Sequence, residues 1–200
     1  MSTWEVREMA KTDPIRTMDD INKIKTYFLE KNRIRDYVLF TFGINTALRI
    51  GDVLHLTWED VFDFQNMQFL NHLMTTEQKT QKKTTIKLND QVYQALLLLK
   101  EKSDPVKPGD YIFQSQRYGN HPIHRTRAYT IIRDAAKAVK LEGVISCHSL
   151  RKTFGYHAWK NGFPPALIMD IYNHSSIEIT RRYLSINQDD KDFLFSKLLL

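Results

Sequence analysis

The segment Tyr37–Ile44 constrains the fold more than any other part of this sequence, because it is apolar on every side when it is drawn as a helix. A helix with no polar face is typical of a protein interior. The rest of the chain must therefore cover it, and 200 residues are enough for one ordinary domain with such a core. The sequence predicts a single domain with a buried helix at this place.

Helical spacing recurs on both sides of this buried segment. Thr17 and Asp20 form a start that resembles a capping box, with aspartate in place of the usual glutamate. Ile21, Ile24 and Phe28 then fall on one helical face. Two later apolar stripes have the same spacing: Val92, Leu96 and Leu99, then Ala128, Ile131, Ile132, Ala135, Ala136 and Val139. These patterns predict a mainly helical chain.

The pattern changes after Leu56. The short runs Trp58–Phe62, Met67–Leu73 and Thr84–Leu88 are predicted to form three strands of an antiparallel sheet. A lysine-rich turn, Lys79–Lys83, joins the last two. The predicted fold class is therefore α+β, mainly α-helical, with one small three-stranded antiparallel sheet.

One domain is expected over residues 17–200, after a polar lead-in over residues 1–16. The N-terminus carries no apolar run of the kind found in secretory signals, and the late apolar stretch Phe193–Leu200 is too short to span a bilayer. A cytoplasmic protein with no membrane partner is therefore predicted.

Composition excludes several classes of site. The single cysteine, Cys147, excludes an internal disulfide framework and a multi-cysteine zinc site. His121 and His124 have no cluster of carboxylates or cysteines beside them, so no metal site is predicted. The net charge of +6 permits an anionic partner without proving one.

Two arginines far apart in the sequence, Arg49 and Arg151, are candidates for binding a phosphodiester. A guanidinium group presents a planar fork of donors that matches two negative oxygens and does not lose its charge. Arg49 has a structural alternative, because Asp52 follows three residues later on the same helical face and can pair with it. Taken alone, Arg49 favours that ion pair.

Two histidines and a tyrosine complete the candidate set. His148 lies three residues before Arg151, so the two share a face if this segment is helical, and imidazole exchanges protons near neutral pH. His174 and Tyr183 follow; a phenol has a pKa of about 10, which nearby arginines and histidines are expected to lower. Each has an ordinary alternative, since histidines often have structural roles and most of the nine tyrosines are expected to be packing residues.

In this order, the segments Thr46–Asp52, Ile145–Phe154 and His174–Tyr183 resemble the catalytic domain of tyrosine recombinases, the phage integrase family. The resemblance covers most of the chain. This sequence departs from the family pattern at three positions: Asp52 where glutamate is commoner, Lys152 where histidine is common, and Asn173 where glycine is usual. Asparagine also adopts left-handed backbone angles, so the turn before His174 is expected to survive.

The resemblance implies a site-specific recombinase or integrase that cuts and rejoins DNA strands through a 3′-phosphotyrosyl intermediate. Tyr183 would be the nucleophile. Lys79 would protonate the leaving 5′ oxygen, with Lys82 and Lys83 as alternatives. The other implied catalytic residues stabilise charge, move a proton or hold the set in place: Arg49, Asp52, His148, Arg151 and His174. Contacts to DNA phosphates are expected from Lys82, Lys83, Arg181 and Arg182, unless these are simply solvated turns and helix faces.

The implied partner is double-stranded DNA, bound by a homo-oligomer that forms a tetramer on it. The tail over residues 189–200 is expected to dock on a neighbouring protomer or to pack on its own core. No cofactor, metal or nucleotide is implied. Family members usually carry a further N-terminal domain that grips the duplex; here it is dispensable, supplied by a separate accessory protein, or lost to truncation.

Two other functions remain open from the sequence. Type IB topoisomerases nick and reseal one strand with a similar residue set, although the spacing of His174 and Tyr183 favours recombinases. A DNA-binding regulator with a residual active site is the non-enzymatic alternative. The sequence sets neither the target site nor the choice among integration, excision, resolution and inversion.

Overall fold

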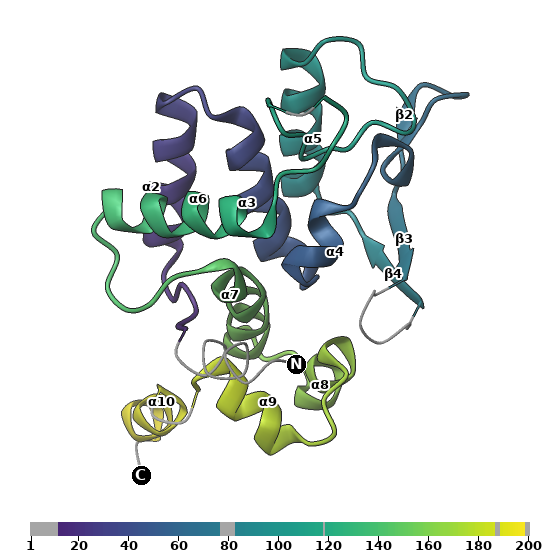
Figure 1. The fold of residues 1–200 in the computed structure, drawn as a ribbon. Helices are drawn as coiled ribbons and strands as arrows, with labels where there is room; N and C mark the ends of the chain where they lie inside the picture. Colours follow the sequence, from purple (N-terminus) through teal and green to yellow (C-terminus); the bar gives the residue numbers. More distant parts are fainter. Residues whose placement is uncertain (1–11, 77–82, 118, 187–188, 199–200) are drawn as a thin grey trace.

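Helix α3 (Ile34–Thr46) is the central helix of the fold, as its all-apolar stretch predicted (Figure 1). The computed structural model describes residues 12–76, 83–117, 119–186 and 189–198. The long helices that pack against α3 include α2 (Met18–Glu30), α5 (Asp90–Lys102) and α7 (Cys147–Lys160). The side chains of Val38, Leu39 and Phe40 on α3 are completely buried.

The predicted helix starts and apolar stripes are confirmed. Thr17 caps α2, where its hydroxyl accepts a hydrogen bond from the backbone N–H of Asp20 at 3.0 Å. Ile21, Ile24 and Phe28 form the buried face of α2. The stripes predicted over positions 92–99 and 128–139 form the buried faces of α5 and α6 (Arg125–Ala138), except that Val139 follows the last turn of α6 and is only partly buried.

A second, smaller core lies where the C-terminal helices meet α7 (Figure 1). It packs α8 (Pro165–Tyr172) and α9 (Ile177–Leu184) against α7, and α10 (Asp189–Lys197) follows. Its buried members are Ala47, Tyr156, Ile168, Tyr172, Leu184 and Ile186. Within the described ranges, no helix is long and apolar enough to cross a membrane.

The prediction of one three-stranded sheet is wrong. The described residues form two separate two-stranded antiparallel sheets. β1 (Phe62–Asp63) pairs with β2 (Gln68–Phe69), and β3 (His72–Thr76) pairs with β4 (Lys83–Lys87). The second hairpin extends away from the helices beside α4 (Ile50–Leu54) (Figure 1).

Local hydrogen bonds from polar side chains account for the difference. A capping box closed by Thr57 makes Trp58–Asp60 a short 3-10 helix instead of a strand. Directly afterwards, the Asp63 carboxylate accepts hydrogen bonds from the backbone and side-chain N–H groups of Asn66, which closes a tight turn. The expected strand Met67–Leu73 is consequently divided between the two hairpins.

Candidate active site

Arg49 is placed by a sharp change of chain direction at the end of α3. Ala47 has a left-handed backbone conformation with φ of 57°, which ends the helix. Arg49 then occupies the N-cap position of α4, and Asp52 is buried within that helix. Arg49 and Asp52 therefore lie in the first turn of one short helix, as their spacing predicted.

Arg151 comes from α7 and is almost completely buried, with 5% of its surface exposed. The Ser146 side chain caps α7 by accepting a hydrogen bond from the backbone N–H of His148 at 3.3 Å. His148 thus lies in the first turn of α7 and Arg151 one turn later, so the two residues share a face as predicted.

Close packing of α7 on α3 brings Arg151 to the segment that carries Arg49. A Cβ atom on Gly43 would lie only 2.7 Å from Cδ1 of Leu150, so glycine is what allows the two helices to approach at this point. The guanidinium group of Arg151 consequently reaches the end of α3, where it donates a hydrogen bond to the backbone carbonyl of Ala47. This carbonyl lies two residues before Arg49.

His174 and Tyr183 are supplied by the two C-terminal helices of the smaller core. α8 ends at Asn173, whose left-handed conformation, with φ of 55°, matches the turn predicted there. Ser176 caps α9, which carries Tyr183 near its end. The rings of His174 and Tyr183 meet edge to face with their centroids 5.2 Å apart.

Three of the other predicted catalytic side chains, Arg49, Arg151 and His174, therefore act on or contact Tyr183. Arg151 hydrogen-bonds its phenol, and both Arg151 and Arg49 act on it electrostatically. Burial raises the pKa of Tyr183, although part of the residue is accessible to solvent, and the two arginine charges oppose that shift. The two arginines lower this pKa, as expected, but burial outweighs them, so the net shift is upward.

The pKa of His174 is lowered by burial, and the positive charges of Arg151 and Arg49 lower it further. The ring is therefore neutral at pH 7 and carries one N–H. Nδ1 lies 3.0 Å from the Thr180 hydroxyl, which lies 3.2 Å from the backbone carbonyl of Ser176. When Thr180 donates to Nδ1, the imidazole N–H is on Nε2; when Thr180 donates to Ser176, the N–H is on Nδ1. Only the first arrangement leaves Nε2 able to donate to a phosphate oxygen.

A cavity of about 420 Å³ opens beside Arg151 and is also lined by residues of β4. Lys83 is one of these residues, so one of the three candidate lysines lines the same cavity as the buried arginine. The other two candidate lysines, Lys79 and Lys82, lie outside the described residues. The choice of general acid among the three stays a prediction.

The two arginines beside the tyrosine have different surroundings. The guanidinium of Arg181 lies 6.0 Å from the centroid of the Trp159 ring, so it packs against α7. Arg182 is exposed on α9. DNA contact by either residue remains a prediction, and only Arg182 presents an open face.

Sequence reasoning assigned no role to two side chains that border this site. Tyr172 is 1% exposed and lies in the small core against His174 and Tyr183. Lys152 is 2% exposed; its ammonium group donates to the backbone carbonyl of Thr12 and lies 5.3 Å from the centroid of the Tyr183 ring. Burial lowers the pKa of Lys152. The only signal in the sequence for either residue is its position: Lys152 directly follows Arg151, and Tyr172 lies two residues before His174.

Comparison with known sequences identifies the family. Residues 16–190 match the Phage integrase family. A probable integrase/recombinase of Bacillus subtilis (strain 168), YoeC, is 44% identical over 181 residues, which cover 90% of this chain and 93% of that protein. A tyrosine recombinase of Thermosipho africanus (strain TCF52B) is 21% identical over 193 residues, which cover 96% of this chain and 64% of that protein.

Solved structures share the fold. The XerA recombinase aligns with a TM-score of 0.71 at 21% identity, over 94% of this chain and 67% of its own. XerH bound to a palindromic difH substrate, in a post-cleavage complex, aligns with a TM-score of 0.69 at 17% identity, over 93% of this chain and 53% of its own. The chain thus spans nearly all of the Bacillus relative but little more than half of XerH. The mainly helical fold of tyrosine-recombinase type is confirmed, and this chain belongs to the phage integrase family.

Proposed function

We propose that this chain is a site-specific recombinase that cuts and rejoins double-stranded DNA, with a lead-in over residues 1–16 and a catalytic domain over residues 17–200. One observation carries the proposal. Arg49, Arg151 and His174 come from separate segments of the chain, yet both arginines act electrostatically on the Tyr183 phenol and the His174 ring packs against it. Because the relatives are bacterial and the substrate is DNA, we expect the protein to act in the cytoplasm.

The proposed reaction is attack of the Tyr183 oxygen on a backbone phosphorus. A bond forms between that oxygen and phosphorus, the bond from phosphorus to the 5′ oxygen breaks, and the 3′ end becomes a phosphotyrosyl ester. His148 assists removal of the phenol proton. Lys79 gives a proton to the 5′ oxygen, with Lys82 and Lys83 as alternatives. The ester conserves the energy of the original linkage, so a 5′ hydroxyl reverses the step.

Charge at the site supports this assignment. A phosphate under attack gains negative charge on its non-bridging oxygens, which donors held in place beforehand stabilise without reorganising. Arg49 and Arg151 supply two positive guanidinium groups, and His174 supplies an N–H when Thr180 donates to its Nδ1. Asp52, in the first turn of the helix that Arg49 caps, is proposed to orient that arginine.

The decisive experiment is covalent trapping. The protein is incubated with a pool of duplexes of random sequence, each of which carries one nick. Cleavage beside the nick releases a short fragment, and loss of that fragment prevents religation and leaves the adduct trapped. We expect a protein–DNA adduct that survives denaturation and maps to Tyr183. Failure to form any adduct while DNA binding persists would favour the regulator, and relaxation of supercoiled plasmid at unrelated sequences would favour the topoisomerase.

A basic cleft of about 980 Å³ supports double-stranded DNA as the partner. It extends along α4, the helix that Arg49 caps, because Gly51 and Leu54 line it. Of the described residues that line it, none is acidic, although the lining residue Arg35 pairs with Asp36. Its basic lining consists of Arg35, His55, Arg117, His121, His124, Arg125 and Arg127. A groove with this lining, along the helix that Arg49 caps, suits the negative backbone of a duplex.

Replacement of Arg117 and Arg127 by alanine is expected to weaken DNA binding to the same degree for all sequences. The plot of log affinity against log salt should become less steep by roughly 1 for each lost phosphate contact, or about 2 for the pair. Fluorescence anisotropy with a labelled duplex over a KCl series measures the slope. Arg133→Ala is the matched control, because Arg133 is on α6 but pairs with Asp134. An unchanged slope in the double variant would remove the cleft from the proposal.

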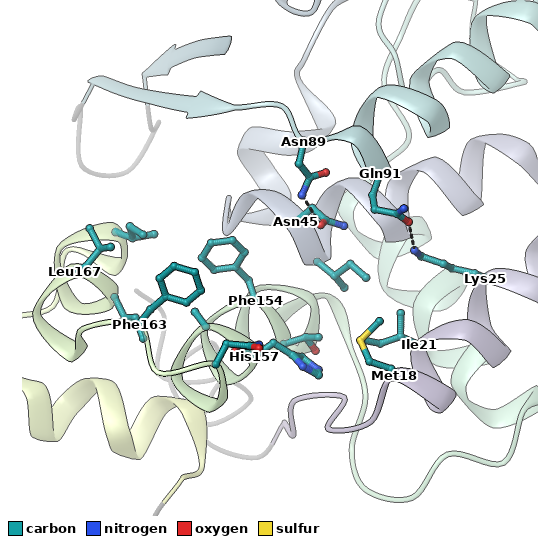
Figure 2. Close-up of a pocket in the computed structure, with 16 residues that line it drawn as sticks. Met18, Ile21, Lys25, Asn45, Asn89, Gln91, Phe154, His157, Phe163 and Leu167 are labelled. Carbon is teal, nitrogen blue, oxygen red and sulfur yellow. Dashed lines mark hydrogen bonds between the residues drawn. The ribbon is translucent and has the colours of Figure 1, made fainter. Parts of the chain in front are cut away.

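Assembly of a tetramer on DNA, through docking of residues 189–200 on a neighbouring protomer, is part of the proposal. Phe195 and Leu198 are 78% and 57% exposed, so the tail offers apolar groups that its own core does not cover. A mostly apolar cavity of about 530 Å³ between α2, α7 and α8 is a suitable acceptor, and Phe163 and Leu167 line its rim (Figure 2). A separate accessory protein that clamps the duplex is a further expected partner.

Replacing Phe195 and Leu198 by serine is expected to weaken assembly on DNA at least tenfold, because burial of one large apolar side chain contributes about 1.5–3 kcal/mol. Sedimentation of the protein on a duplex with two binding sites measures the assembly. Leu167→Ser should cause a similar loss from the acceptor side. Met67→Ser, which removes a 67% exposed apolar group from the β1–β2 turn, should change nothing. If the tail variant and Leu167→Ser both assemble on DNA like the native protein, this docking is excluded.

A further inference from the structure

Tyr172 occupies an unusual position at the end of α8. It is 1% exposed, and its hydroxyl donates a hydrogen bond to the backbone carbonyl of Arg151 while accepting one from the backbone N–H of Gly155. The side chain fits because α7 has glycine at this point. A Cβ on Gly155 would lie 2.6 Å from the Tyr172 hydroxyl and 2.6 Å from Cδ2 of Leu184. The ring is therefore held in one place by α7.

Three of the proposed catalytic side chains contact this one ring. The guanidinium carbon of Arg151 lies 4.6 Å from the ring centroid of Tyr172. The His174 imidazole stacks on it at 5.4 Å with an interplanar angle of 21°, and the Tyr183 ring lies at 5.4 Å with an angle of 53°. A cation over an aromatic face and stacked rings are both favourable geometries. Tyr172 is thus a neighbour common to two charge-stabilising groups and the phenol.

Tyr172 is not itself a competing nucleophile. Both hydrogen bonds of its hydroxyl go to the backbone of α7. Burial raises its pKa far above the ordinary value for tyrosine, so the phenolate does not form under physiological conditions. Its contribution to the site is the face of its ring.

We propose that Tyr172 is a positioning residue for strand cleavage, whose ring holds the Arg151 guanidinium and the His174 imidazole against Tyr183. This inference rests on the proposed function. Reacting groups must be held close to their productive geometry, and a displacement of about 1 Å costs on the order of 10²-fold in rate. Loss of the ring frees Arg151 and His174 to move, whereas the cleft residues that bind DNA are on other elements.

The test compares Tyr172→Phe with Tyr172→Leu. Phenylalanine retains the ring and is expected to form the covalent adduct within about threefold of the native rate, while leucine is expected to slow it roughly 30-fold or more with DNA affinity unchanged. Rates are measured in single turnover on the trapped nicked duplex, at a temperature where each variant is folded by circular dichroism. Tyr156→Leu is the matched control, since Tyr156 is a buried tyrosine of the same small core with Arg16 over its ring; it should lower stability without lowering the rate.

A second measurement does not depend on catalysis. The imidazole of His174 is faced by Tyr172, Tyr183, Thr180, Arg151 and Arg49. Removing the Tyr172 ring admits water and lets Arg151 move away. Both changes should raise the pKa of His174 toward its ordinary value, as followed by NMR of the ring protons. Tyr172→Phe should leave this titration as in the native protein.

Five outcomes separate the possibilities. The inference is supported if Tyr172→Leu forms the adduct slowly while Tyr172→Phe and Tyr156→Leu form it at close to the native rate. A Tyr172→Leu variant as fast as the native protein overturns it while leaving the proposed function intact. A Tyr172→Phe variant as slow as Tyr172→Leu also overturns it, because the hydroxyl rather than the ring would then matter. If the native protein forms no adduct, the proposed function fails, and an unchanged His174 titration in Tyr172→Leu overturns the positioning role independently.

Discussion

Tyr183→Phe is expected to bind duplex DNA with native affinity and to form no covalent adduct. The substitution removes one oxygen and retains the ring, so the contacts with His174 and Tyr172 at 5.2 and 5.4 Å are preserved. Without the oxygen no phosphotyrosyl ester can form. The loss should be on the order of 10⁴-fold or more, as when an enzymatic nucleophile is removed. A denaturing gel of the trapping reaction gives the adduct yield, and anisotropy gives the affinity.

Tyr27→Phe is a suitable control for this experiment. Tyr27 is on α2 and packs against Phe28 and Arg33, away from the site. This variant should react like the native protein. An adduct formed by Tyr183→Phe, or one that maps to another tyrosine by peptide analysis, would refute the assignment of the nucleophile.

Arg151→Lys is expected to have the second largest effect. Lysine keeps a positive charge but lacks the planar fork of donors. Arg151 donates to the Ala47 carbonyl, hydrogen-bonds Tyr183 and lies over the Tyr172 ring, and a single ammonium group cannot reproduce all three contacts. Loss of one charge-stabilising donor costs about 10²–10³-fold in rate. The single-turnover rate of adduct formation should fall by that amount.

The same substitution should also lower the stability of the fold. Because Arg151 is 5% exposed, buried hydrogen-bonding groups are left without a partner, at a cost of about 1–3 kcal/mol in the free energy of unfolding. Urea unfolding measures this loss. Arg133→Lys on α6, whose guanidinium pairs with Asp134 at the surface, should change neither quantity. A reaction rate within threefold of native for Arg151→Lys would remove Arg151 from the proposed machinery.

Most helices could be predicted from the sequence, and the physical reason is that their determinants are local. The Thr17 cap and the apolar faces of α2, α5 and α6 depend on residues three or four positions apart. The left-handed turn at Asn173 is equally local, because it follows from what asparagine tolerates. The sheet was predicted wrongly because a capping box at Thr57 and a turn at Asp63 overrode an alternation of residues that suited strands.

The sequence by itself determined which residue types are available for phosphodiester chemistry and that Arg49, His148, Arg151, His174 and Tyr183 occur in the order of the family. Only the tertiary structure decided which of them meet. Arg151 reaches the Ala47 carbonyl across 104 positions of sequence because α7 packs closely on α3, and no local pattern encodes that contact. The positions of Tyr172 and Lys152 beside the phenol, and the effect of burial on its pKa, likewise arise from the packing of separate helices, since desolvation depends on every atom nearby and not on neighbours in the chain.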